Sequence, residues 1–218
     1  MMRTMPPPIR NVEFRDKLSE LLKEALRMED RAAPLHLLRS FEDMVSGQRQ
    51  PAFGEELQAE LPAATQRVEA YCRALEELSR RSFRPGGSVR RALEEAACLF
   101  NEGLFFEVHE ILEAVWLTQE EGVRLLLQGL IQIAVGFHHL ENNNLRGALS
   151  LLQEGVEKVK GYGSDRPGVE LDQFLAQIER ARRSIESLGG AAFDRFDRRM
   201  IPHMPLMRDT LSDVRPVG

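Results

Sequence analysis

Apolar residues recur every three or four positions along most of this chain. No stretch alternates apolar and polar residues with the period of two that a half-buried strand requires. The first apolar stripe consists of five residues that would share one helix face, Phe14, Leu18, Leu21, Leu22 and Leu26. Asn11 precedes this stripe and suits a helix N-cap. The pattern predicts an all-α protein, a multi-helical bundle of about seven helices with no β-sheet.

Prolines, glycines and capping residues divide the chain into helical segments. Pro34 suits the first turn of a second helix, and Pro62 is predicted to open a third after a polar loop at about 48–60. Ser88 can cap the next helix, which Gly103 can end. Further helices are predicted at about 104–120, 123–141, 144–160 and 169–188.

The run Arg84-Pro85-Gly86-Gly87 is the best candidate for a domain boundary, because no helix continues through it. We therefore predict an N-terminal helical extension at 1–87, in which three helices over residues 11–83 pack on a bundle at 88–188. Pro202 and Pro205 interrupt the C-terminal tail at 189–218. The tail is expected to lie against the bundle or a partner.

Composition restricts the class of protein further. The 218 residues are 43% apolar and 29% charged, the balance of a chain that buries a core. The longest uncharged stretch, Leu125 to Leu140, is shorter than the ~20 residues of a membrane-spanning helix. A net charge of −5 disfavours nucleic acid as a partner. Prolines near the start argue against an export signal, and two cysteines are too few for a disulfide framework. No membrane and no nucleic acid are expected as partners, and a cytoplasmic location is predicted.

The segment FNEGLFFEVHEILEAVW, residues 100–116, carries the most informative side chains. On a helix, His109 is predicted to lie within the apolar stripe that includes Val108 and Leu112, and therefore to be buried. Glu113 follows one turn later, within reach of the imidazole. A buried carboxylate needs a donor, a cation or a proton, so His109 and Glu113 are expected to form a core-facing pair. Trp116 and the phenylalanines are assigned to the core.

The next helix is apolar on nearly every side and is expected to be central in the bundle. Gln128 and His139 fall on one stripe, and His138 lies on the adjoining one. Gly129 and Gly136 would let a neighbouring helix approach closely. A helix hairpin near 120–122 would bring His109, Glu113 and Gln128 together with one of the two histidines.

These residues form a distinctive pattern: aromatic-Glu-x-His-Glu-x-x-Glu-x-x-Trp, then Gln-Gly-hydrophobic-Ile, then a histidine ten residues after that glutamine. The pattern resembles the domain-of-unknown-function 309 family over about residues 88–188. The matching positions are Phe106, Glu107, His109, Glu110, Glu113, Trp116, Gln128, Gly129 and His138. The resemblance implies a compact helical bundle found in bacteria and archaea, without an established activity. It singles out His138, whereas the helical wheel favours His139, and both alternatives stay open.

Three interpretations of the polar cluster compete. In the first, His109, Glu113 and His138 or His139 hold a divalent metal ion, and Glu110 or a water completes the shell. The zinc pattern His-Glu-x-x-His would need a histidine at position 113, and the two Glu-x-x-His pairs of di-iron bundles are absent. In the second, the cluster lines a pocket for a small polar ligand. In the third, His109 and Glu113 form a structural buried pair. On the helical wheel Glu107 points nearly opposite to the apolar stripe, and near the helix start it is expected to complement the helix dipole.

The functional prediction is an internal site of His109, Glu113, Gln128 and His138 that binds a divalent metal ion or a small polar ligand, with metal-assisted hydrolysis as the candidate reaction. The alternative is a non-enzymatic helical module that binds a partner protein through grooves between helices. A faint sequence echo at a spacing of 41 residues and the N-terminal helices favour this alternative. The sequence does not decide whether any reaction is catalysed.

Overall fold

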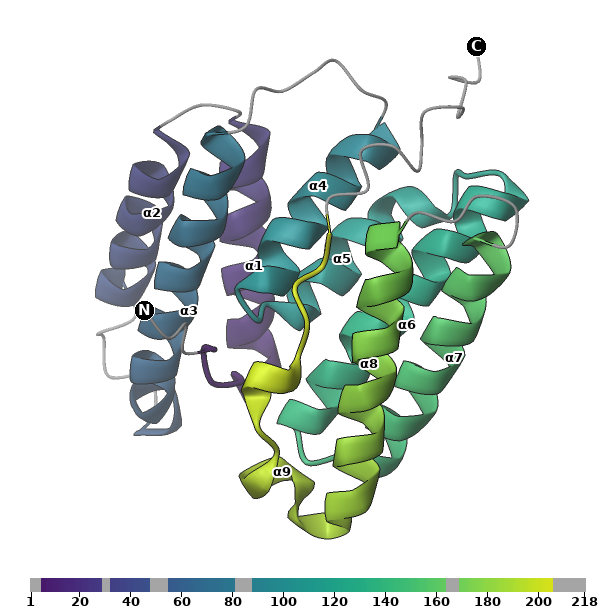
Figure 1. The fold of residues 1–218 in the computed structure, drawn as a ribbon. Helices are drawn as coiled ribbons and strands as arrows, with labels where there is room; N and C mark the ends of the chain where they lie inside the picture. Colours follow the sequence, from purple (N-terminus) through teal and green to yellow (C-terminus); the bar gives the residue numbers. More distant parts are fainter. Residues whose placement is uncertain (1–4, 29–31, 48–54, 81–87, 164–168, 206–218) are drawn as a thin grey trace. The chain divides into compact units, whose positions relative to one another are not determined.

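The computed structural model describes residues 5–28, 32–47, 55–80, 88–163 and 169–205, and within these ranges it contains helices and no strand (Figure 1). The all-α prediction is confirmed. The described ranges hold eight long helices, a small difference from the predicted seven, followed by one short helix. They are α1 (Val12–Arg27), α2 (Ala33–Gly47), α3 (Glu55–Ser79), α4 (Ser88–Asn101), α5 (Phe105–Trp116), α6 (Glu121–Glu141), α7 (Leu145–Gly163), α8 (Val169–Leu188) and α9 (Ala192–Arg195).

The chain forms two compact units. The first comprises residues 1–83 together with 102–104, and the second comprises residues 84–101 together with 105–218. Helices α1 to α3 therefore belong to the first unit and α4 to α9 to the second.

In the first unit, α1, α2 and α3 pack against one another. Asn11 caps α1 as predicted, because its Oδ1 accepts a hydrogen bond from the Phe14 N–H at 3.0 Å. Glu60 of α3 accepts hydrogen bonds from the backbone N–H groups of Arg10 and Asn11 at 3.2 and 2.9 Å. The start of α1 is thereby fixed to α3. The predicted apolar stripe of α1 is buried except for Leu21, which is partly exposed.

The prediction that Pro62 opens the third helix is wrong. Helix α3 begins at Glu55, so Pro62 lies inside it, and the predicted loop at 48–60 overlaps its first turns. The segment EELQAEL consists of strong helix formers, which favour helix ahead of the proline. The proline ring removes one backbone hydrogen bond without ending the helix. Burial of Val68 and Tyr71 further along stabilises α3 in place.

Four phenylalanine rings form the centre of the second unit. Phe100 of α4 lies 5.1, 5.9 and 5.7 Å from Phe105 of α5, Phe137 of α6 and Phe174 of α8, measured between ring centroids, each in an edge-to-face arrangement. All four side chains are buried. Edge-to-face pairs add stabilisation beyond the burial of apolar area. This cluster joins four helices around one core.

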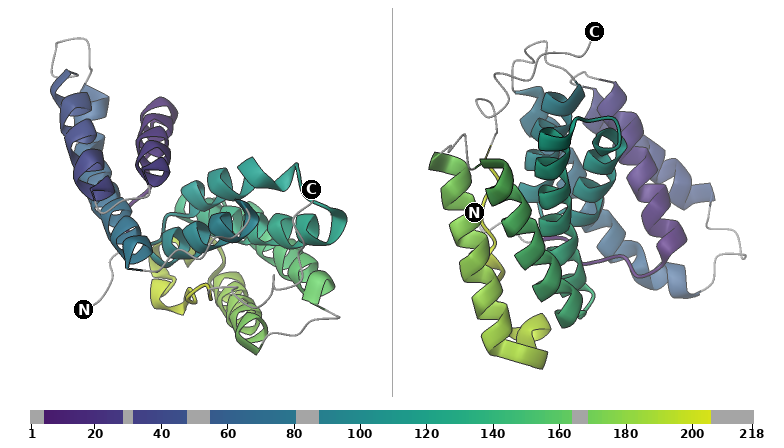
Figure 2. Two further views of the ribbon diagram at one scale, coloured as in Figure 1. Left: turned by 90° about the horizontal axis from the view of Figure 1, so that it is seen from above. Right: turned by 90° about the vertical axis from the view of Figure 1, so that its right-hand side faces the viewer.

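Helix α6 contacts α5, α7 and α9, as expected for a central helix. Gly129 and Gly136 allow α7 to approach closely: a Cβ added at these positions would lie 2.6 Å from Val159 Cγ2 and 2.8 Å from Leu152 Cγ. The predicted role of these glycines is confirmed, and Figure 2 shows α7 alongside α6. By length and composition α6 could cross a membrane, but half of that stretch is buried inside the protein, as in the core helix of a bundle.

The described part of the C-terminal tail lies against the second unit. Its segment at 201–205 is extended, and the side-chain amide of Asn101 makes two hydrogen bonds to the backbone of Met204. Oδ1 accepts from the Met204 N–H at 2.7 Å, and Nδ2 donates to the Met204 carbonyl at 3.2 Å. Met204 and Phe196 are buried, so apolar contact adds to these hydrogen bonds.

Candidate functional site

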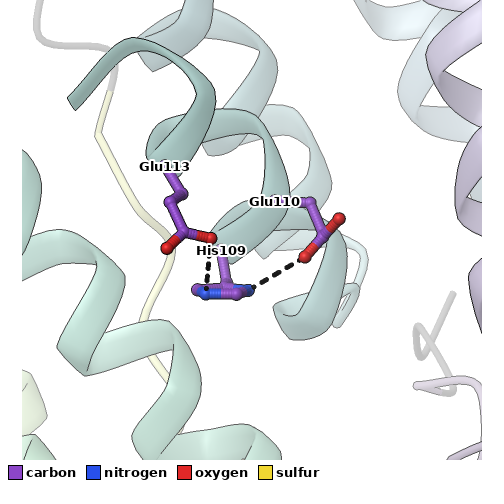
Figure 3. Close-up of side chains that lie close together, drawn as sticks. All are labelled: His109, Glu110 and Glu113. Carbon is purple, nitrogen blue, oxygen red and sulfur yellow. Dashed lines mark ion pairs between the residues drawn. The ribbon is translucent and has the colours of Figure 1, made fainter. Parts of the chain in front are cut away.

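The candidate site lies on α5, whose start is set by a glycine. Gly103 adopts φ +76°, the left-handed conformation that ends α4 and turns the chain into α5. Two turns of α5 then present His109, Glu110 and Glu113, which we call the α5 cluster. The α5 cluster is shown in Figure 3.

Both ring nitrogens of His109 face a carboxylate. Nδ1 lies 3.3 Å from Glu110 Oε1, and Nε2 lies 3.2 Å from Glu113 Oε2 (Figure 3). A neutral imidazole carries one N–H and can donate to one of these oxygens, whereas the doubly protonated ring can donate to both. The arrangement therefore places two carboxylates around one imidazole, a set of oxygen and nitrogen atoms that can coordinate a cation.

The α5 cluster is accessible to solvent, and the prediction of a buried, core-facing pair is wrong. The side chains of His109 and Glu110 are about one-quarter exposed, at 27% and 26%, and that of Glu113 is 52% exposed. The buried face of α5 is centred on Val108 and Leu112, and His109 lies about 60° round the helix from Leu112, at its edge. The predicted contact between His109 and Glu113 is present, but the pair does not belong to the core.

Trp116 also departs from its assignment to the core. It is half-buried at the end of α5, where its indole Nε1 donates a hydrogen bond to the Arg124 carbonyl at 3.1 Å. The Arg124 guanidinium carbon lies 5.0 Å from the centroid of the Trp116 ring. The side chain connects α5 to α6 through one hydrogen bond and a cation–π contact.

Glu107 occupies the first turn of α5, the position predicted from the helix dipole. It is nevertheless almost fully buried, whereas Glu110 and Glu113 are not. The wheel placed Glu107 away from the apolar stripe. The burial results from tertiary contacts that an isolated helix does not have.

The structure does not join Gln128 and His138 to the α5 cluster. Among the described residues, no hydrogen bond or ion pair connects either side chain to His109 or Glu113, and the potential metal-binding group contains only the three residues of the α5 cluster. The centroid of the Phe106 ring lies 6.2 Å from that of His109 and 5.7 Å from that of His138. His138 and the α5 cluster therefore share the Phe106 ring as a neighbour.

The two neighbouring histidines of α6 face different helices. His138 lies against Phe106 of α5, whereas His139 Nδ1 lies 3.2 Å from Asn144 Nδ2, beside the start of α7. Burial lowers the pKa of His139, and the charge of His138 lowers it further. Of the two, His138 lies on the side of α5, although no contact identifies either one as a ligand.

A polar network between α6 and α7 was not predicted from the sequence. Gln132 Nε2 donates to Glu154 Oε2 at 3.0 Å, and Ser150 Oγ donates to Glu154 Oε1 at 2.8 Å. The sequence signal was the position of Gln132 on an otherwise apolar helix, but its partner lies 22 residues away. In this network the hydroxyl of Ser150 donates a hydrogen bond to the carboxylate of Glu154.

Comparison with known proteins supports the family resemblance. Residues 93–151 match the family model described as Domain of unknown function (DUF309), a span that includes the whole α5 cluster. A relative from Aquifex aeolicus (strain VF5), named only as an uncharacterized protein, is 28% identical over 88 residues, which make up 40% of this chain and 26% of the relative. This chain thus covers about a quarter of that relative's length. No solved structure matches the chain.

Proposed function

We propose that the α5 cluster binds a divalent metal ion through His109, Glu110 and Glu113. One observation carries the proposal: a ring nitrogen and one oxygen from each carboxylate lie within 4.8 Å of one another, on a face that solvent can reach. The two carboxylates are negatively charged and the imidazole offers a lone pair, so a cation is the species that complements these three side chains.

The donor set fits the chemistry of several metals. One nitrogen and two oxygen ligands suit borderline divalent ions such as Zn²⁺, Mn²⁺ and Ni²⁺. The exposure of Glu113 leaves space for water or a small polar ligand beside the ion. A bound metal ion would supply an acidified water at neutral pH, which makes metal-assisted hydrolysis the reaction class that we propose. The cytoplasmic location stays a prediction.

Thermal melting with added metal tests this proposal. Wild-type protein stripped with a chelator should melt at higher temperature as Zn²⁺, Mn²⁺ or Ni²⁺ is added, since an ion bound only by the native state stabilises it by about 2.7 kcal/mol at a hundred times its dissociation constant. His109→Ala and Glu113→Gln should each reduce that response. His203→Ala, which removes an exposed histidine of the tail, is the matched control and should respond like the wild type.

The same experiment separates a metal site from a structural pair. Because His109 and Glu113 are partly exposed, their contact is worth at most about 1 kcal/mol, and His109→Ala should change metal-free stability little. If wild type and His109→Ala respond equally to each metal, the α5 cluster is not the binding site.

A second candidate function is a non-enzymatic module that binds another protein. Helix α2 supports it, because Leu35 and Leu38 lie one turn apart with 52% and 38% of their surface exposed. A photo-crosslinking residue placed at position 35 or 38 should then join a defined second chain. The same residue at the exposed position 20 of α1 should give no such product, and equal crosslinking at both places would argue against α2 as a binding surface.

A further inference from the structure

A buried carboxylate at the end of α6 makes no hydrogen bond, and His138 is its ion-pair neighbour. Glu141 is 5% exposed, and neither of its side-chain oxygens has a hydrogen-bond partner. Among the described residues, no lysine or arginine lies within ion-pair distance of it. A buried carboxylate without hydrogen bonds is costly, and a cation bound beside it would compensate for its lost hydration.

The position on the helix increases this requirement. Glu141 is the last residue of α6, where unpaired carbonyls give the helix terminus a partial negative charge. A carboxylate is disfavoured at this end of a helix, and a cation is favoured. The buried charge and the helix terminus therefore both favour a bound cation.

His138 supplies a second donor atom one turn earlier. Its Nδ1 lies 3.7 Å from Glu141 Oε2, which is too long for a hydrogen bond. Two ligands of one zinc-like ion, with bonds of about 2.0–2.2 Å, stand roughly 3.3–3.5 Å apart at a tetrahedral angle. The observed separation is within a few tenths of an ångström of that spacing.

The surroundings of His138 differ from those of Glu141 in their exposure to solvent. The His138 side chain is 17% exposed, and Asn142 beside it is exposed at the end of the helix. The Phe106 ring covers the imidazole from the side of α5. The Asn142 Nδ2 lies 3.5 Å from His138 Nδ1 and 3.2 Å from Nε2, so an ion bound at Nδ1 would displace this amide.

We propose that His138 and Glu141 form a second cation site, distinct from the α5 cluster, that takes a divalent transition-metal ion of the zinc and cobalt type. The site joins one imidazole nitrogen with a carboxylate, the donor pair that such ions accept. The Phe106 ring lies beside both His138 and His109. The inference does not depend on metal binding at the α5 cluster.

Cobalt binding to the full chain tests the second site. Metal-free protein is dialysed against Co²⁺, and bound Co²⁺ per chain is measured together with its visible absorption. Glu141→Gln and His138→Asn should each bind one Co²⁺ fewer than wild type, whereas Glu157→Gln, an exposed substitution on α7, should bind as wild type does. His109→Ala should keep the ion at His138 and Glu141. If the α5 cluster binds no metal, wild type and His109→Ala bind equally, and Glu141→Gln still loses its ion.

Thermal melting of the metal-free variants checks that each variant folds. Because Glu141→Gln removes a buried charge that makes no hydrogen bond, it should melt at or above the wild-type temperature in the absence of metal. Retention of the wild-type number of Co²⁺ ions by either Glu141→Gln or His138→Asn would overturn the proposal. A lower melting temperature of metal-free Glu141→Gln would also overturn it, since Glu141 would then be stabilised by a proton or by His138 alone.

Discussion

At the scale of single residues, burial controls the chemistry of Cys72. Its thiol lies half-buried on α3 and donates to the Pro34 carbonyl at an Sγ–O distance of 3.8 Å. Burial, with a smaller contribution from the nearby Glu76 carboxylate, raises the pKa of Cys72 to about 11. The thiolate, which is the reactive form, is therefore rare at ordinary pH.

Alkylation rates measure this effect directly. In a Cys98→Ala variant, Cys72 is the remaining cysteine, and at pH 8 a pKa of about 11 in place of 9.0 reduces the thiolate fraction about a hundredfold. Iodoacetamide should therefore modify Cys72 about a hundredfold more slowly in the folded protein than in urea. Similar rates in the two states would show that Cys72 is not shielded as the structure places it.

Glu95 of α4 gives stability a pH dependence of definite sign. Burial raises its pKa above 4.5, although a hydrogen bond from Arg91 Nε at 2.8 Å acts in the opposite direction. Its contribution to stability is thus fully present below pH 4.5 and is lost as pH rises through the folded-state pKa. Urea unfolding between pH 4 and pH 7 should show wild type losing stability relative to Glu95→Gln as pH rises. A constant difference in unfolding free energy between wild type and Glu95→Gln across this range would contradict a raised pKa of Glu95. The control is Glu157→Gln, a substitution at an exposed position of α7.

At the scale of elements, the contact between α6 and α7 depends on glycines in both helices. A Cβ at Gly129 would meet Val159 Cγ2 at 2.6 Å and the Gly155 carbonyl oxygen at 2.8 Å, and a Cβ at Gly155 would lie 2.6 Å from the Gly129 carbonyl oxygen. Because backbone atoms cannot move aside as a flexible side chain can, the two helices would have to separate. Small residues at both positions therefore set the distance between the helices.

Alanine substitutions test this close approach. Gly129→Ala should destabilise the protein by about 1–3 kcal/mol, because overpacking outweighs the gain in helix propensity. Gly161→Ala on α7 is the matched control: its added Cβ would meet Leu125 Cδ2 at an ordinary 3.5 Å. The control should raise stability by up to about 1 kcal/mol through helix propensity. Equal effects of the two substitutions in thermal melts would show that α6 and α7 do not approach as closely as described.

At the scale of the whole molecule, one side chain connects the C-terminal tail to the bundle. The two hydrogen bonds between Asn101 and Met204 link positions 103 residues apart. Asn101→Ala should remove both and cost about 1–3 kcal/mol locally, because the buried Met204 N–H would lose its acceptor. Hydrogen exchange at residues 201–205 should accelerate in this variant. The control is Asn142→Ala, at the exposed end of α6, which should leave the exchange at residues 201–205 unchanged. Unchanged exchange in Asn101→Ala as well would show that apolar contact alone holds the tail.

The sequence by itself determined most of the helices, because the signals that form a helix are local. Asn11 caps α1 through a residue three positions away, and Gly103 takes a left-handed conformation that few other residues adopt. Glycines on α6 also predicted close approach by a neighbouring helix, since the absence of a side chain is visible in the sequence. The contact between His109 and Glu113 followed from their spacing of four residues.

Only the tertiary structure decided which side of each helix is covered. A helical wheel gives the angular order of side chains but not the positions of neighbouring helices, so it placed His109 inside and Glu107 outside, the reverse of their observed burial. Likewise, nothing near Glu141 in the sequence reveals that its carboxylate is buried without a hydrogen-bond donor. Burial is a sum over contacts from distant segments, and the chemistry of these charged residues depends on that sum.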